Sequence, residues 1–79
     1  MPRYFFDFAE DGRLAPDEVG TELADLDAAR EEALTTLAGI AMDEMPDGDR
    51  REFALTIRDD DGTKLTATLS VQVEYASTP

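Results

Sequence analysis

Carboxylates are the side chains whose number and spacing in this sequence could support chemistry. The chain has 79 residues, with 19 Asp and Glu against 7 Lys and Arg, and its net charge is −12. Asp7, Asp11, Gly12 and Glu18 occupy positions of a calcium-binding loop. Another ligand position is Ala9, and the segment follows a strand pattern where a calcium loop needs a helix. A hairpin turn is therefore the better interpretation of residues 7–18.

Catalytic residue types are scarce. The chain has no histidine and no cysteine, so the commonest general base and the strongest nucleophile are both missing. The serines are Ser70 and Ser77, and neither has a candidate activating base. Asp59, Asp60 and Asp61 could attract a divalent ion weakly, but an acidic turn explains them better. We expect no enzyme activity, no metal and no cofactor.

The charge and the apolar content limit the partners. A strongly acidic chain repels phosphates and anionic lipids, so we expect no nucleic-acid or membrane partner. Apolar residues make up 42% of the chain, which favours folding over disorder. No run of about 18 apolar residues occurs, and the start does not resemble a signal peptide. We therefore expect one cytoplasmic domain spanning residues 1–79.

Strict alternation of apolar and polar residues predicts strands. It runs from Lys64 to Tyr75 and, more briefly, from Phe53 to Arg58, with the acidic turn 59–62 between them. This arrangement predicts a hairpin. Residues 3–8 predict another strand, with Tyr4, Phe6 and Phe8 in the core and with Phe5 and Asp7 on the opposite face. Residues 19–23 predict a short strand before the helix.

The middle of the chain predicts one helix within residues 23–45, with Asp25 as its N-cap. Its apolar stripe consists of Leu26, Ala29, Ala33, Leu37 and Ile40, widened by Leu34, Ala38, Ala41 and Met45. The small alanines leave room for the aromatic rings of the first strand. The predicted fold class is α+β, in the order β-β-α-β-β, with one helix on one face of a four-stranded antiparallel sheet.

Four segments carry a family resemblance: M-P-R-Y-F-F-D-F at residues 1–8, E-D-G at 10–12, D-E-V-G-T-E-L-A-D-L-D-A-A-R-E-E-A-L at 17–34, and R-D-D-D-G at 58–62. Together they resemble a small bacterial domain-of-unknown-function family that opens with this aromatic strand. The resemblance implies a small α+β domain and brings no established activity. Residues 3–38 are also similar, more weakly, to HicB-type antitoxin domains, although the segment expected before the helix and a DNA-binding domain are missing.

These observations predict a non-enzymatic protein-interaction domain that forms a homodimer. A small cysteine-free chain has a limited core, and the long alternating last strand, if it lies at a sheet edge, favours pairing with a second copy. The alternative is an acidic, antitoxin-like inhibitor of a basic protein, although acidity also serves solubility alone. The expected interaction surface consists of Phe5, Asp7, Asp59, Asp60, Asp61, Thr66, Thr68, Ser70 and Gln72.

Overall fold

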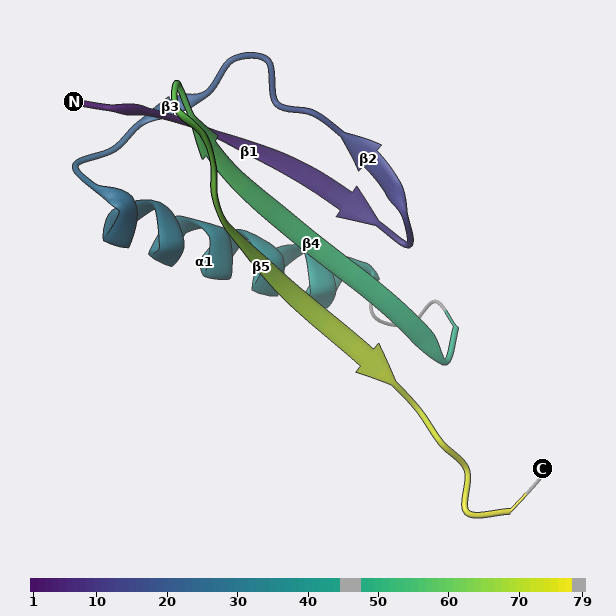
Figure 1. The fold of residues 1–79 in the computed structure, drawn as a ribbon. Helices are drawn as coiled ribbons and strands as arrows, with labels where there is room; N and C mark the ends of the chain where they lie inside the picture. Colours follow the sequence, from purple (N-terminus) through teal and green to yellow (C-terminus); the bar gives the residue numbers. More distant parts are fainter. Residues whose placement is uncertain (45–47, 78–79) are drawn as a thin grey trace.

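The structure is a computed structural model that describes residues 1–44 and 48–77. In these residues one helix covers one face of a five-stranded antiparallel sheet (Figure 1). The elements are β1 (Arg3–Glu10), β2 (Arg13–Ala15), β3 (Thr21–Glu22), α1 (Leu26–Glu44), β4 (Arg50–Asp59) and β5 (Gly62–Gln72). The α+β class and the single helix are confirmed. The four-stranded arrangement was wrong by one strand, because residues 13–15 add β2.

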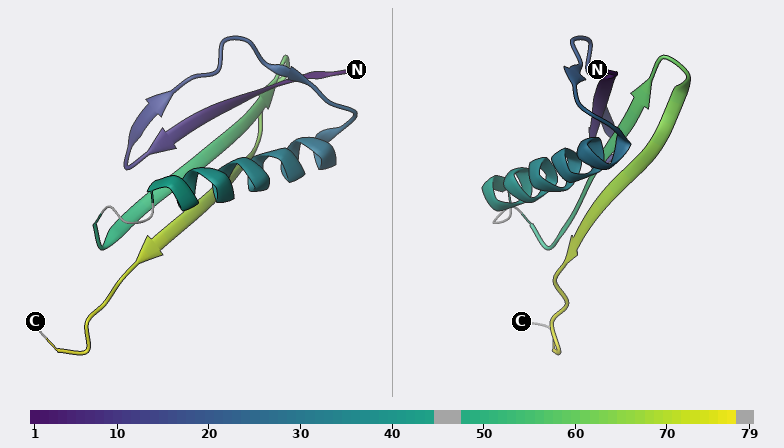
Figure 2. Two further views of the ribbon diagram at one scale, coloured as in Figure 1. Left: turned by 180° about the vertical axis from the view of Figure 1, so that it is seen from behind. Right: turned by 90° about the vertical axis from the view of Figure 1, so that its left-hand side faces the viewer.

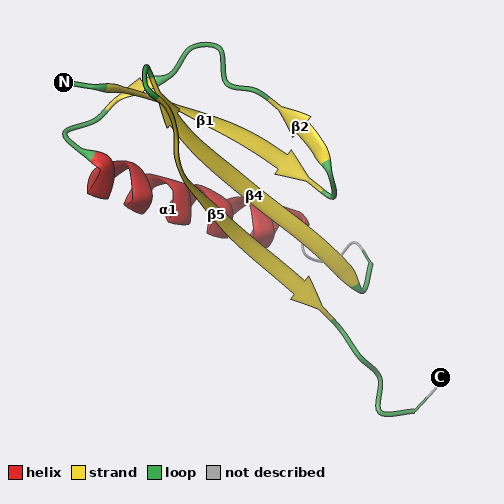
Figure 3. Ribbon diagram, viewed as in Figure 1, coloured by secondary structure: helices red, strands yellow, loops and turns green. Residues whose placement is uncertain are grey.

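Strand β1 lies inside the sheet, whose order is β2-β1-β4-β5, and β3 also pairs with β1. Strands β2 and β3 share one edge of β1, with β2 opposite its C-terminal half and β3 opposite its N-terminal half (Figure 3). The hairpin of β4 and β5 extends the sheet on the other side. Strand β5 is therefore the outermost strand.

Strand β2 was missed because it carries no alternation in burial: all three of its residues are exposed. Its turn had a clear signal, however. Asp11 and Gly12 both adopt positive φ, 49° and 88°, between the paired residues Glu10 and Arg13. Two consecutive positive φ values define the type I′ hairpin turn that Asp-Gly favours. Residues 7–18 thus form a hairpin turn, as expected, and continue into a strand.

The helix begins where the sequence predicted. The carboxylate of Asp25 accepts the backbone N–H of Ala28 at 2.9 Å, which is an N-cap bond. The buried core consists of Tyr4, Ala29, Ala33, Leu37, Ala41, Phe53, Leu55 and Ile57, with Phe6 and Phe8 packed against it. The buried apolar face of the helix is narrower than the predicted stripe, because Leu34 is 43% exposed and Ala38 is also exposed. Met45 lies outside the described residues.

The last strand ends earlier than its sequence pattern. Strand β5 stops at Gln72 because its partner β4 begins at Arg50, directly opposite. One further bond follows, from the N–H of Val73 to the carbonyl of Asp49 at 2.7 Å. Val73 and Tyr75 continue the apolar alternation but are 48% and 62% exposed. The chain leaves the sheet there as an extended segment (Figure 2).

The surface is large for a chain of this size. A compact folded monomer of this mass exposes about 4,700 Å², whereas this chain exposes 5543 Å². The Cα radius of gyration is 14.6 Å, against about 12 Å for a compact domain of this length. The extended segment after Gln72 contributes to both differences. In the described residues, the helix lacks the long apolar sequence needed to span a bilayer.

Candidate interaction surface

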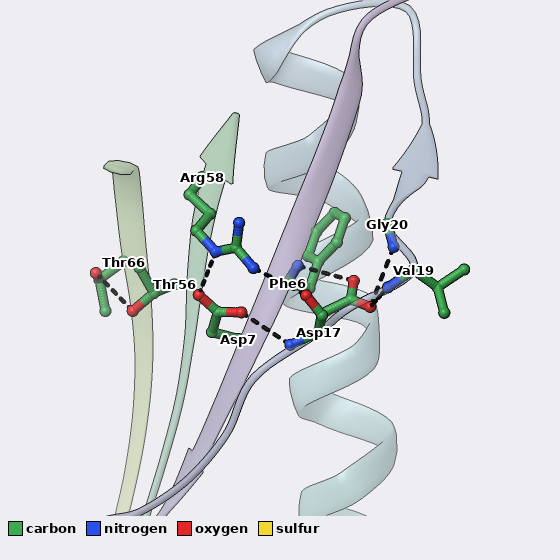
Figure 4. A network of polar contacts seen from close by, with 8 residues as sticks. All are labelled: Phe6, Asp7, Asp17, Val19, Gly20, Thr56, Arg58 and Thr66. Atoms are coloured by element: carbon green, nitrogen blue, oxygen red, sulfur yellow. Dashed lines mark hydrogen bonds and ion pairs between the residues drawn. The ribbon is translucent and has the colours of Figure 1, made fainter. Parts of the chain in front are cut away.

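The face of the sheet opposite α1, called here the outer face, carries polar side chains from three strands. Asp7 of β1 lies opposite Thr56 of β4, which lies opposite Thr66 of β5. The hydroxyls of Thr56 and Thr66 are 3.1 Å apart (Figure 4). Because side chains alternate along a strand, Thr68, Ser70 and Gln72 follow Thr66 on this face. The outer face therefore unites six of the nine predicted surface residues.

Phe5 and Asp7 occupy one end of the outer face, where Arg58 holds both. The Nε of Arg58 donates to Asp7 Oδ2 at 2.8 Å, and its Nη2 donates to the carbonyl of Asp17 at 2.9 Å. The guanidinium lies 4.5 Å from the centre of the Phe5 ring. Both predicted residues thus contact their own chain, and neither offers a fully free contact.

Asp17 completes this network from the loop between β2 and β3 (Figure 4). Its Oδ2 accepts the backbone N–H of Phe6 at 3.1 Å, and its Oδ1 accepts those of Val19 and Gly20 at 3.0 and 3.1 Å. Its own N–H donates to Asp7 Oδ1 at 2.9 Å. The carboxylate of Asp17 therefore provides the hydrogen-bond acceptor that a neighbouring strand would provide along this stretch of β1.

The network lowers the pKa of both acids. For Asp17, the hydrogen bonds from the N–H groups of Phe6 and Gly20 stabilise the carboxylate and bring its pKa below 3.8. For Asp7, partial burial raises the pKa, but the bonds from Arg58 and Asp17 together outweigh it, so the net pKa is also below 3.8. Both side chains are therefore ionised at neutral pH.

A second network lies at the opposite end of the sheet, around Arg51. The Nε of Arg51 donates to Asp11 Oδ2 at 3.0 Å, and its Nη2 lies 3.2 Å from Glu10 and 3.7 Å from Glu44. Arg51 thereby joins the β1–β2 turn to the end of α1, and its side chain is only 11% exposed. The backbone N–H of Glu52 is the largest cause of the lowered pKa of Asp11.

A groove of about 440 Å³ opens beside Arg51. Its lining residues are Asp11, Arg50, Arg51, Glu52, Ser70, Val71 and Gln72. Two lining residues, Asp11 and Arg51, already form a salt bridge with each other. In the part of the chain that the structure describes, no three acids are placed to hold a metal ion. Asp7 and Asp11 of the calcium-loop pattern instead belong to separate arginine networks.

The outer edge of β5 carries free backbone groups, and the register shows which. The N–H of Phe6 donates to Asp17, away from β4. Adjacent residues of antiparallel strands direct their backbone groups alternately toward and away from each neighbour. Ile57 lies opposite Phe6, so its backbone N–H and C=O groups point toward β5. Leu65 lies opposite Ile57, so its backbone groups point back toward β4. From Leu65 onward the backbone groups alternate, so the N–H and C=O groups of every second residue point away from β4, to the free edge: Thr66, Thr68, Ser70 and Gln72.

A second observation supports this assignment. The N–H of Val73 bonds toward Asp49, as the alternation requires for an odd-numbered residue of this strand. Among the described residues, no strand covers the outer edge of β5. The residues from 65 to 73 carry no charge and no proline, although a third of the chain is charged. This edge therefore lacks the charges and prolines that protect exposed strands.

The remaining predicted residues lie in the turn between β4 and β5. Asp59 Oδ1 accepts the N–H of Asp61 at 2.8 Å and lies 3.8 Å from Lys64 Nζ. Asp60 and Asp61 are exposed. Lys64 is the extra residue of an irregularity in the register, which separates this acidic turn from the regular part of β5. The turn and the free edge are therefore adjacent but distinct surfaces.

Sequence reasoning missed Arg58, Asp17 and Arg51. The segment D-E-V-G at residues 17–20 did contain a signal, because an Asp that precedes a Gly in a loop commonly accepts nearby backbone N–H groups. The arginines had no such local signal. Their closest carboxylate partners, Asp11 and Asp7, lie 40 and 51 positions away in the chain, so only the tertiary fold brings them together.

Comparison with known proteins gives one match. The family described as a domain of unknown function, DUF6894, matches residues 3–71. No curated protein and no solved structure matches the chain. The match covers β1 through nearly all of β5, including both networks and the free edge. It does not bear on the similarity to HicB-type antitoxins, which stays a prediction. The chain belongs to the DUF6894 family of domains of unknown function.

Proposed function

We propose that this protein is a non-enzymatic interaction domain that forms a homodimer through the outer edge of β5. The observation that carries the proposal is the row of outward backbone groups at Thr66, Thr68, Ser70 and Gln72. Two copies can pair these groups and continue the sheet across both molecules. Because each chain carries a net charge of −12, the uncharged residues 65–73 are where two copies approach at the least electrostatic cost.

The exposed surface supports the same proposal. The chain exposes 5543 Å², about 800 Å² more than a compact monomer of its mass. A buried core of eight residues, three of them alanines, supplies limited stability by itself. A second copy adds burial without requiring a larger chain.

Light scattering coupled to size-exclusion chromatography tests the proposal at micromolar concentration. The expected mass is twice 8.7 kDa. Thr68→Pro removes an N–H that points to the free edge and leaves the bonds to β4 in place, so it should yield a folded monomer. Thr68→Val keeps the N–H and should remain dimeric. A wild-type mass of 8.7 kDa would overturn the proposal.

A second candidate function is inhibition of a basic protein. Exposed acids favour it: Asp60 and Asp61 project at the β4–β5 turn, and Asp43 and Asp49 are exposed near the end of α1. Such a surface presents carboxylates where a basic protein would otherwise bind phosphates. A pull-down from the native host should then recover a basic protein that high salt releases and that Asp60→Asn/Asp61→Asn binds less. Recovery that is unchanged by salt and by this variant would count against inhibition.

A further inference from the structure

We infer that the two copies pair their β5 strands antiparallel with Leu69 at the two-fold axis, and that this pairing extends each strand to Tyr75. The inference rests on the proposed dimer and specifies its register. It also accounts for the segment after Gln72, which continues the strand pattern in sequence although β4 offers it no partner.

Backbone geometry selects the register. A two-fold axis through Leu69 places Thr68 of one copy opposite Ser70 of the other, and Thr66 opposite Gln72. All outward N–H and C=O groups of β5 then face one another, giving about eight hydrogen bonds between the copies. An axis through Thr68 would leave the outward backbone groups of Gln72 without a partner among these four residues in either copy. An axis through Ser70 would do the same to Thr66.

Side-chain faces agree with this register. Leu69 meets its own copy, Ala67 lies opposite Val71, and Leu65 lies opposite Val73, all on the face that carries the helix. Thr66, Thr68, Ser70 and Gln72 meet on the outer face, as polar cross-strand pairs. Val73, which is 48% exposed in the single chain, gains an apolar neighbour. Val73 therefore has a packing role that the single chain does not provide.

Charge complementarity supports the same axis. The register brings Glu74 of one copy next to Lys64 of the other, the residue at the irregularity that ends the regular part of β5, at both ends of the paired segment. Glu74 already lies beside the outer face, because its Oε1 accepts the side-chain N–H of Gln72 at 2.8 Å. Lys64 Nζ lies 3.8 Å from Asp59 of its own chain, and the Lys64 side chain remains 34% exposed. The nearest alternative axes would bring Gln72 or Ala76, which carry no charge, next to Lys64.

Disulfide trapping tests the register directly, because the native chain has no cysteine. Thr68→Cys and Ser70→Cys are prepared separately, then mixed and oxidised mildly. Residues that face each other in a hydrogen-bonded antiparallel pair have Cα atoms about 5.5 Å apart, which suits a disulfide. The mixture should form at least several-fold more cross-linked dimer than either variant alone. Thr35→Cys, exposed on α1, provides the control for random collision.

The outcomes separate the register from the dimer itself. Efficient cross-linking of Thr68→Cys alone would move the axis to residue 68, and that of Ser70→Cys alone would move it to residue 70. A dimeric mass by light scattering without cross-linking above the Thr35→Cys level would remove β5 pairing and leave a dimer by another surface. A monomeric mass for the wild type would remove the proposed function together with the register.

Discussion

The carboxylate of Asp17 accepts the backbone N–H of Phe6 at 3.1 Å in the gap that β2 and β3 leave along β1. An inner strand needs partners for its N–H groups on both sides, since an unpaired buried donor costs free energy. Asp17 meets this need with a side chain and uses its other oxygen to fix the turn at Val19 and Gly20. It thereby holds the loop of residues 16–20 against the sheet.

Replacing Asp17 by Asn should destabilise the protein by about 2 kcal/mol, because a neutral amide accepts hydrogen bonds more weakly and turns an N–H₂ group toward backbone donors. Urea unfolding followed by circular dichroism measures the change. Glu18→Gln is the matched control, since Glu18 is exposed and adjacent, and it should change stability by less than about 0.5 kcal/mol. Equal effects of the two variants would contradict the role of Asp17.

Acid should remove this contribution. The pKa values of Asp7 and Asp17 lie below 3.8 in the folded protein, so their stabilisation is present above that pH and is lost as the pH falls through the folded pKa. Protonation also relieves the repulsion among 19 acids, so total stability combines two opposing effects. The free-energy difference between wild type and Asp17→Asn isolates the first effect.

That difference should be about 2 kcal/mol near pH 6 and should narrow as the pH falls through the lowered pKa of Asp17, because protonated Asp and Asn have similar hydrogen-bonding properties. Urea unfolding of both proteins across this range provides the measurement. A difference that stays constant with pH would show that Asp17 acts through its shape and not through its charge.

How far the sequence predicts the fold depends on what each element buries. The hairpin of β4 and β5 was predictable because Phe53, Leu55 and Ile57 enter the core at every second position. The helix cap at Asp25 was predictable from its residue type. Strand β2 was not, because all its side chains are exposed and its pairing is set by the backbone of the Asp11–Gly12 turn. Alternation also assigns faces without assigning neighbours, so it does not place β5 at the edge.

The candidate site divides in the same way. Thr66, Thr68, Ser70 and Gln72 were predictable as one polar face, because a period of two assigns that face directly. Phe5 was expected on the face away from the core, as part of the interaction surface. In the structure the guanidinium of Arg58 lies over the ring of Phe5. Arg58 also forms a salt bridge with Asp7, which is 51 positions away in the sequence. Contacts across such separations leave no local pattern in the sequence.

Two glycines should respond to alanine in opposite directions. A Cβ on Gly20 would lie 2.9 Å from both Arg3 Cγ and Phe5 Cε1, at a φ of +77°, so Gly20→Ala should cost more than about 1 kcal/mol. Gly39 lies in α1 with nothing within 4 Å of the added carbon, so Gly39→Ala should stabilise by about 0.5–1 kcal/mol. Thermal unfolding compares the two variants. A neutral Gly20→Ala would show that the loop does not pack closely on Phe5.

Salt should strengthen the dimer. Two chains that each carry −12 repel one another, whereas the paired residues 65–73 are uncharged, so screening removes more repulsion than attraction. The dissociation constant, measured by sedimentation equilibrium, should fall several-fold when NaCl rises from about 0.05 M to about 0.5 M, over which the Debye length shortens from above to below 10 Å. Thr68→Pro should stay monomeric at both concentrations. The acidic-inhibitor hypothesis requires the opposite trend for its complex, because salt screens the attraction between an acidic and a basic surface. A dimer that dissociates as salt rises would instead place attraction between opposite charges, and not pairing of the uncharged edge, at the centre of the interface.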